Sequence, residues 1–224
     1  MPTNFIFMLT RNDKTIPNAL ECAQEAITAG VTHIGFKDIG IAFQQMKALV
    51  QILRNAQVTT YLEVVSLDAK SEIKSAEMAL QLKVDYLLGG TRPQLVAPIV
   101  QAHPLKYLPF VGSIHGHPSK LLGTIPEIVT HARKISSMKG VDGLDLLAYR
   151  FTGDVPRLIQ QVNQASLKPI IVAGSINNNK RIEAVKKAGV QGFTIGTAAF
   201  ENRFNDQEKG LKAQLAAIFK TVRL

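Results

Sequence analysis

The sequence predicts a single α/β domain, residues 1–224, folded as an eight-stranded parallel (β/α)8 barrel. Three observations predict it: short apolar runs alternate with longer amphipathic segments, the alternation repeats eight times, and no linker rich in Pro, Gly or Ser divides the chain. An open doubly wound sheet is the competing fold. It would carry a glycine-rich turn after its first strand, where this chain has Thr10-Arg11-Asn12-Asp13.

The expected strands are short runs of apolar residues, as in sheets that are buried on both faces. They span residues 4–9, 31–37, 58–65, 84–88, 107–111, 143–148, 169–172 and 192–195. The segments between them have helical periodicity: Ala19, Ala23 and Ala26 recur at steps of three and four residues. Gly30 and Gly189 end two of these helices, because glycine adopts the left-handed cap conformation without strain. The carboxyl ends of the strands are where such barrels place their chemistry.

Composition narrows the class of protein. With 46% hydrophobic and 19% charged residues the chain is typical of soluble globular proteins, and no apolar run reaches the ~18 residues of a membrane span. Residues 1–10 have no basic leader or small-residue cleavage site, and Cys22 is the single cysteine, so we expect a cytoplasmic protein. The net charge of +9 favours anionic partners. Basic runs interleaved with aromatic residues are missing, which disfavours nucleic acid.

Glycines end the seventh and eighth expected strands. Gly174 and Ser175 lie in the segment 171–176, and Gly196 and Thr197 in the segment 193–198. Glycine lets the backbone approach an anion closely, and a short helix after Gly196 would direct free N–H groups at it. Barrels frequently bind phosphate after these two strands, so we expect a phosphate site here. The alternative is that both glycines only permit tight turns.

These two motifs resemble those of the ribulose-phosphate-binding barrel superfamily, which has the TIM-barrel fold. The match lies in Val172-Ala173-Gly174-Ser175-Ile176 and Ile195-Gly196-Thr197-Ala198, and the strand layout extends it over the whole chain. Ser175 stands where many members have a second glycine, and the first strand ends without the acidic residue that several members use. The resemblance implies phosphorylated sugars or related small acids as substrates and leaves the reaction open.

Three ionisable residues are expected inside the barrel. Lys37 and Glu63 end adjacent strands, and Asp145 lies within an apolar strand where it needs a partner, for which Lys37 is the obvious cation. Such a cluster could move a proton at a carbon next to a carbonyl, with Glu63 or Asp145 as base and Lys37 stabilising the enolate. The alternatives are a purely structural ion pair and a lysine that forms an imine.

Loop residues complete the list of candidates. His115 and His117 follow the fifth strand at a spacing that suits proton transfer or hydrogen bonding to substrate, and no third metal ligand is specified by spacing. Arg150 suits a carboxylate or phosphate, or else a salt bridge with Asp154. Four further residues, Arg11, Asp13, Lys14 and Arg92, are expected as solvated residues of the rim.

The function expected from these residues is that of a phosphosugar isomerase or epimerase. A lyase, either an aldolase or a decarboxylase using Lys37, is the alternative, and a non-catalytic barrel that senses a phosphometabolite is the third hypothesis. No cofactor is required, although the histidine pair leaves a divalent metal open. The apolar stripe of residues 211–219 leaves a homo-oligomer open, because the same stripe could instead pack on the barrel.

Overall fold

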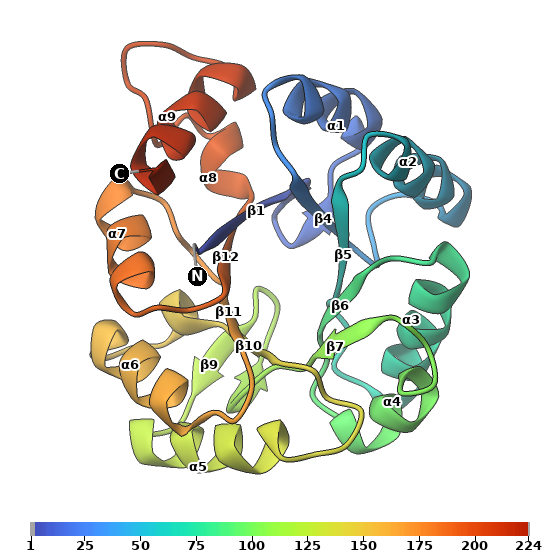
Figure 1. Cartoon of the computed structure of the whole chain (residues 1–224), viewed down its shortest axis with the longest axis vertical. Helices are drawn as coiled ribbons and strands as arrows, with labels where there is room; N and C mark the ends of the chain where they lie inside the picture. The colour runs from blue at the N-terminus through green and yellow to red at the C-terminus, as the bar shows by residue number, and fades with distance from the viewer. Residues whose placement is uncertain (1–2, 224) are drawn as a thin grey trace.

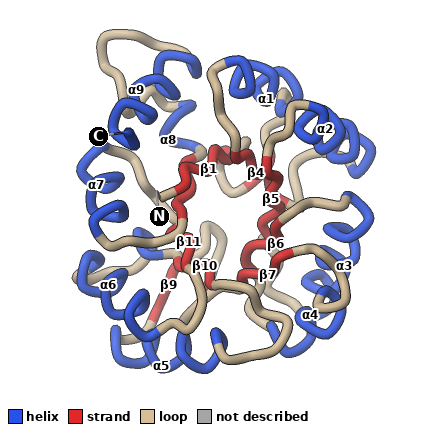
Figure 2. Tube along the Cα trace, viewed as in Figure 1, coloured by secondary structure: helices blue, strands red, loops and turns tan. Residues whose placement is uncertain are grey.

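A computed structural model describes residues 3–223 and shows a ring of parallel strands enclosed by helices (Figures 1 and 2). The ring is one eight-stranded sheet, as predicted. Its strands are β1 (Asn4–Met8), β4 (His33–Lys37), β5 (Thr59–Val64), β6 (Tyr86–Gly89), β7 (Lys106–Leu108), β10 (Leu144–Leu146), β11 (Ile170–Val172) and β12 (Gly192–Ile195). Every expected strand is found, with ends that differ by up to three residues.

The sheet closes between its first and last members. Neighbouring strands pair in the order β10-β11-β12-β1-β4-β5-β6-β7, all parallel. The remaining gap is joined by a bridge between Phe110 and Asp145. There the amide of Asp145 donates to Pro109 O at 2.9 Å, and the amide of Val111 donates to Asp145 O at 3.1 Å. Asp145 therefore closes the barrel through its backbone.

Helices cover the outside of the barrel (Figure 2). They are α1 (Ala19–Thr28), α2 (Phe43–Asn55), α3 (Ala69–Leu82), α4 (Pro93–Val100), α5 (Ile125–Ser136), α6 (Val155–Ala165), α7 (Asn179–Lys187), α8 (Thr197–Phe200) and α9 (Leu211–Arg223). The predicted alanine stripe of α1 is buried. Gly30 and Gly189 follow α1 and α7 with φ of 87° and 67°, which confirms their role as helix ends.

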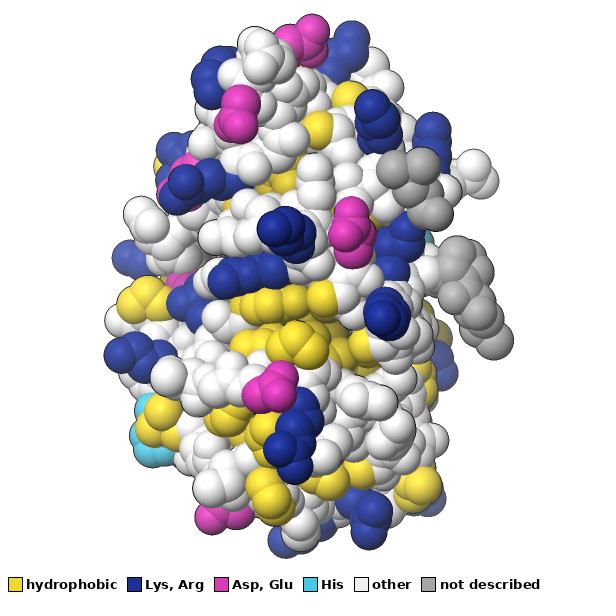
Figure 3. All heavy atoms as spheres, turned by 90° about the vertical axis from the view of Figure 1, so that its left-hand side faces the viewer, with side chains coloured by type: hydrophobic (Ala, Val, Ile, Leu, Met, Phe, Trp, Pro, Cys, Tyr) yellow, Lys and Arg dark blue, Asp and Glu magenta, His cyan; other side chains and the backbone are white. Residues whose placement is uncertain are grey.

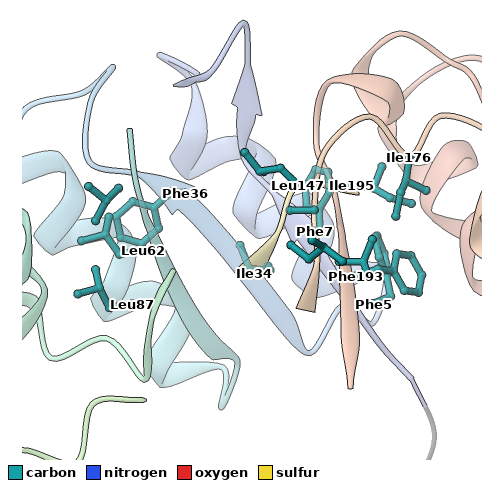
Figure 4. Packing of buried hydrophobic residues seen from close by; sticks show 14 of the residues in the cluster. Phe5, Phe7, Ile34, Phe36, Leu62, Leu87, Leu147, Ile176, Phe193 and Ile195 are labelled. Carbon is teal, nitrogen blue, oxygen red and sulfur yellow. The ribbon is translucent and has the colours of Figure 1, made fainter. Parts of the chain in front are cut away.

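Apolar side chains fill both faces of the sheet. Phe36, Leu62 and Leu87 of three successive strands pack together in the layer under the helices (Figure 4). A second cluster fills the barrel interior and consists of Ile6, Met8, Tyr61, Leu88, Leu108 and Ile171. Because side chains alternate along a strand, Lys37 and Glu63, two residues beyond Gly35 and Tyr61, extend the interior layers toward the carboxyl ends.

Two short hairpins at the carboxyl ends of the strands were not predicted. One consists of β2 (Thr10–Arg11) and β3 (Lys14–Thr15), directly after β1. The other consists of β8 (Ser113–His115) and β9 (Lys120–Leu122), after β7. A 3-10 turn, η1 (Ala148–Arg150), follows β10 and begins at the last residue of the expected strand 143–148. These segments bring loop residues over the mouth of the barrel.

The outer surface carries dispersed positive charge. On the face that includes α6, α7 and α9, Lys and Arg side chains are spread among hydrophobic ones (Figure 3). The apolar stripe of α9 is buried through Leu211, Leu215 and Ile218, and α9 contacts α1 and α7. That stripe packs on the barrel. Within residues 3–223 no helix has the length and apolar character needed to cross a membrane.

Candidate active site

A cavity of about 210 Å³ lies at the carboxyl ends of β1, β4, β5, β11 and β12. Six of the residues expected from the sequence line it together with Arg150, and other polar residues complete the wall. The expected ones are Lys37, Glu63, Gly174, Ser175, Gly196 and Thr197, and the others are Thr10, Asp13, Ser119, Asn177, Thr194 and Glu201. The backbone segments at Gly174–Ser175 and Gly196–Thr197, here called the glycine edges, and the side chains of Lys37 and Glu63 thus line one cavity.

Lys37 and Glu63 form an ion pair at the bottom of this cavity. They are register partners on β4 and β5, and Lys37 Nζ donates to Glu63 Oε1 at 2.9 Å. Their side chains are 10% and 8% exposed, so water screens the pair little. Adjacent parallel strands with the same side-chain parity place the two groups together, as the sequence predicted.

Lys37 has a second acidic partner. Its Nζ also donates to Asp13 Oδ1 at 3.3 Å. Burial disfavours the ammonium, but the charges of Glu63 and Asp13 and their hydrogen bonds outweigh it and hold the pKa of Lys37 above its ordinary value. Lys37 is therefore a fixed cation at neutral pH.

Asp13 corrects the sequence interpretation, which placed it on a solvated rim. The β2–β3 hairpin folds it over the barrel, where its side chain is 11% exposed. Asp13 Oδ1 also accepts a hydrogen bond from Arg150 Nη2 at 3.3 Å. Burial opposes ionisation of Asp13, but Lys37 and Arg150 outweigh this effect and hold its pKa below the ordinary value. No periodic pattern marks a residue at the tip of a six-residue hairpin, so only tertiary structure reveals its role.

Asp145 does not line the cavity. Its side chain is fully buried, and neither carboxylate oxygen has a hydrogen-bond partner among the described residues. Burial, reinforced by the negative charge of Glu63 and opposed by Lys37, raises the pKa of Asp145 well above its ordinary value. Lys37, the cation expected to pair with Asp145, instead donates its hydrogen bonds to Glu63 and Asp13. Its surroundings therefore favour the protonated form of Asp145 more than water does.

Neighbouring atoms lie so close to Gly174 and Gly196 that a larger residue would contact them. Gly174 has φ of 107°, and a Cβ added there would lie 3.2 Å from Arg150 Cγ. A Cβ on Gly196 would lie 2.5 Å from Thr10 Oγ1 and 3.1 Å from Met8 O. Gly196 is also the N-cap of α8, the short helix expected after it. Both edges are held against other backbone segments and face one cavity.

Of the candidate residues on loops, Arg150 lines the cavity, whereas His115 and His117 do not. Arg150, on η1, binds Asp13 and not Asp154, whose side chain instead caps α6 by accepting from the amide of Arg157. His115 is exposed on β8 and hydrogen-bonds Ser113 Oγ at 2.8 Å. His117 is exposed and lines a separate groove. Neither histidine lines the cavity, and within residues 3–223 no cluster of three or more His, Cys, Asp or Glu side chains is placed to hold a metal ion.

Comparison with known proteins finds similarity in structure and none in sequence. No protein-family model and no curated protein matches the chain. The tryptophan synthase α-subunit from Pyrococcus furiosus has a TM-score of 0.69 at 11% identity, covering 97% of this chain and 98% of that one. The native KDPGal structure has a TM-score of 0.68 at 14% identity, covering 100% and 95%.

A third solved structure is similar over its whole length. Monomers of the dimeric phosphoribosylanthranilate isomerase from Thermotoga maritima give a TM-score of 0.67 at 13% identity, covering 99% of this chain and 98% of theirs. At such low identity these likenesses establish the fold. The chain is a (β/α)8 barrel, as the sequence predicts.

Proposed function

We propose that this protein is an enzyme that binds a phosphorylated sugar or sugar acid and moves a proton at the carbon next to its carbonyl. One observation carries the proposal: the two glycine edges and the Lys37–Glu63 pair line the same cavity at the carboxyl ends of the strands. Among the similar structures is phosphoribosylanthranilate isomerase in complex with reduced 1-(o-carboxyphenylamino)-1-deoxyribulose 5-phosphate, a phosphorylated ligand in the same fold. The proposal makes this chain an isomerase or epimerase.

The phosphate is gripped at one end of the cavity. Gly174 and Gly196 present backbone to it, and Ser175 and Thr197 add hydroxyl donors. Binding the phosphate, which does not react, fixes the carbonyl carbon relative to the ion pair. Such positioning converts remote binding energy into a lower barrier for the chemical step.

Lys37 stabilises the negative charge that develops on the carbonyl oxygen. Its raised pKa keeps it protonated, and its burial strengthens its interaction with an enolate. Glu63 takes the proton from the adjacent carbon and returns it to a neighbouring position. Asp145, the other base expected from the sequence, suits this role less, since it does not line the cavity and burial disfavours its ionised form.

The same charges bear on the lyase alternative. Imine formation needs a neutral amine, whereas Glu63 and Asp13 hold Lys37 as an ammonium. This favours proton transfer over an aldolase or decarboxylase that works through a lysine imine. The non-catalytic alternative, a barrel that senses a phosphometabolite, would use the phosphate grip without the proton transfer.

Deuterium exchange tests the proposal. The enzyme is incubated in D2O with a panel of pentulose and hexulose phosphates, and loss of the C–H signal next to the carbonyl is followed by proton NMR. We expect exchange with at least one phosphosugar, its loss by about 10²-fold or more in Glu63→Gln, and wild-type exchange in Asp206→Asn, an exposed carboxylate outside the cavity. Tight binding of a phosphosugar with no exchange and no conversion would leave the sensor as the better description.

Borohydride separates the lyase from the isomerase. Reduction in the presence of each phosphosugar should leave the mass of the peptide containing Lys37 unchanged if no imine forms. A reduced adduct on Lys37 would establish imine chemistry and overturn the proposed proton-transfer role.

A further inference from the structure

Two cations that line the cavity could bind an anionic group of a ligand, but both are paired with Asp13 of this same chain. In the described part of the chain, Lys37 and Arg150 are the two cations that line the cavity. Both contact the same atom, Asp13 Oδ1, at 3.3 Å each. The carboxylate of Asp13 thus lies where two convergent cations would bind an oxyanion of a ligand.

The Asp13 carboxylate also decides the net charge of the cavity wall. Its lining holds three carboxylates, Asp13, Glu63 and Glu201, against the two cations. With Asp13 in place the wall has a net formal charge of −1, which opposes entry of a phosphate or carboxylate. Removal of the Asp13 carboxylate from the wall removes this excess and frees both cations.

The hairpin that carries Asp13 is anchored at its base and loosely held at its tip. At the base Thr15 Oγ1 donates to Lys37 O and accepts from Lys37 N, both at 2.8 Å, and the Thr15 amide donates to Ile39 O. At the tip Asn12 and Asp13 have φ of 51° and 56°, a left-handed conformation that costs non-glycine residues energy. Arg11, before the turn, donates to Phe200 O at 3.5 Å and lies over the Phe200 ring. Within the turn Asn12 is exposed, and the ion pairs of Asp13 hold the turn inward.

Asp13 is also an incompletely satisfied anion. Its second oxygen, Oδ2, is buried and has no hydrogen-bond partner among the described residues. A buried, unpaired carboxylate oxygen costs free energy, which lowers the free-energy cost of exchanging Asp13 for another anion. The backbone and Cγ of Arg150 pack against Gly174, and Arg150 lines the same cavity as both glycine edges.

We propose that Lys37 and Arg150 form an anion subsite which Asp13 fills in the free protein, and that an oxyanion group of the ligand enters by displacing Asp13 as the hairpin tip moves outward. The ligand group is a phosphate or a carboxylate. This inference rests on the proposed function for the identity of the cavity as the substrate site, and it adds a gate that the substrate itself must open.

Anion titration of matched variants tests the gate. Inorganic phosphate and, separately, oxalate are titrated into the wild type, Asp13→Asn and Glu201→Gln by isothermal calorimetry. Glu201 lines the same cavity, but its side chain contacts Arg203 and neither of the two cations, so its substitution removes equal charge without freeing them. We expect Asp13→Asn to tighten anion binding by at least about tenfold and Glu201→Gln by less than about threefold. The preferred anion identifies the ligand group.

Two further variants make the outcome decisive. Arg150→Met in the Asp13→Asn background should remove the gain, and Asp13→Ser should reproduce it; melting curves confirm that each variant is folded. Equal gains in Asp13→Asn and Glu201→Gln, or no gain in either, would overturn the gate. If Asp13→Asn binds phosphate tightly but Thr197→Ala in that background does not weaken it, the gate stands and the proposed phosphate grip fails. If the wild type binds phosphate and Asp13→Asn does not improve it, the grip stands and the gate fails.

Discussion

Removal of the Lys37 ammonium is expected to destabilise the barrel at neutral pH. At an effective dielectric constant of about 20, unit charges at 2.9 and 3.3 Å attract by roughly 6 and 5 kcal/mol, and the cost of burying the charges offsets part of this. Lys37→Met leaves Glu63 and Asp13 without that cation, so we expect a loss of about 3–5 kcal/mol in the free energy of unfolding. For a chain of 224 residues this corresponds to a fall in Tm of roughly 6–20 °C.

Urea unfolding of Lys37→Met and of Lys37→Met/Glu63→Gln measures the effect. The double variant should recover more than half of the loss, because the glutamine needs no counter-charge. The raised pKa of Lys37 means that its contribution is complete below its ordinary pKa of 10.5 and is lost as the pH rises through its value in the folded protein. A loss below about 1 kcal/mol in the single variant, typical of an exposed ion pair, would refute the reasoning.

Three further predictions follow from other buried groups. Asp145→Asn should gain stability relative to the wild type as the pH rises above the ordinary aspartate pKa of 3.8, because the unfolded aspartate ionises at a lower pH than the folded one. The gain is about 1.4 kcal/mol for each unit by which the folded pKa is raised; urea unfolding at pH 4 and pH 7 checks it, and a constant difference contradicts it. Gly196→Ala should weaken phosphate binding and lower the free energy of unfolding by about 1–3 kcal/mol, because the added Cβ would overlap Thr10 Oγ1. The control Gly189→Ala, whose Cβ would meet open space, should retain wild-type phosphate affinity in calorimetry. Glu72 is fully buried and binds the Arg92 side chain and the amides of Thr91 and Arg92, and none of these residues lines the cavity. Glu72→Ala should therefore lower the free energy of unfolding, measured in urea, by about 3–5 kcal/mol without changing phosphate affinity, and a loss below about 1 kcal/mol would contradict this.

The barrel was predictable because its signal is regular. Parallel strands buried on both faces appear as separate apolar runs, and their repeated alternation with amphipathic helices leaves few alternative topologies. The pairing of Lys37 with Glu63 follows from the same regularity, since adjacent strands with equal side-chain parity bring such residues together. The ends of the strands were less certain, because tertiary hydrogen bonds decide where pairing stops.

The site residues that lie on loops were less accessible to sequence reasoning. Asp13 and Arg150 meet because two segments 137 residues apart fold over the same cavity, and neither segment has a period that predicts the contact. Asp145 was correctly expected to be buried, but its expected partner, Lys37, donates its hydrogen bonds to Asp13 and Glu63 instead. His115 and His117 were expected to serve proton transfer or substrate binding, but one lies in strand β8 and the other in the turn after it, and neither lines the cavity.

A crystal structure of the protein soaked with inorganic phosphate is the most direct measurement of where the ligand binds. We expect a phosphate within hydrogen-bonding distance of the backbone at residues 174–175 and 196–197, in the cavity that Lys37 and Glu63 share. Phosphate bound elsewhere, with both glycine edges left empty at saturating concentration, would contradict the proposed site.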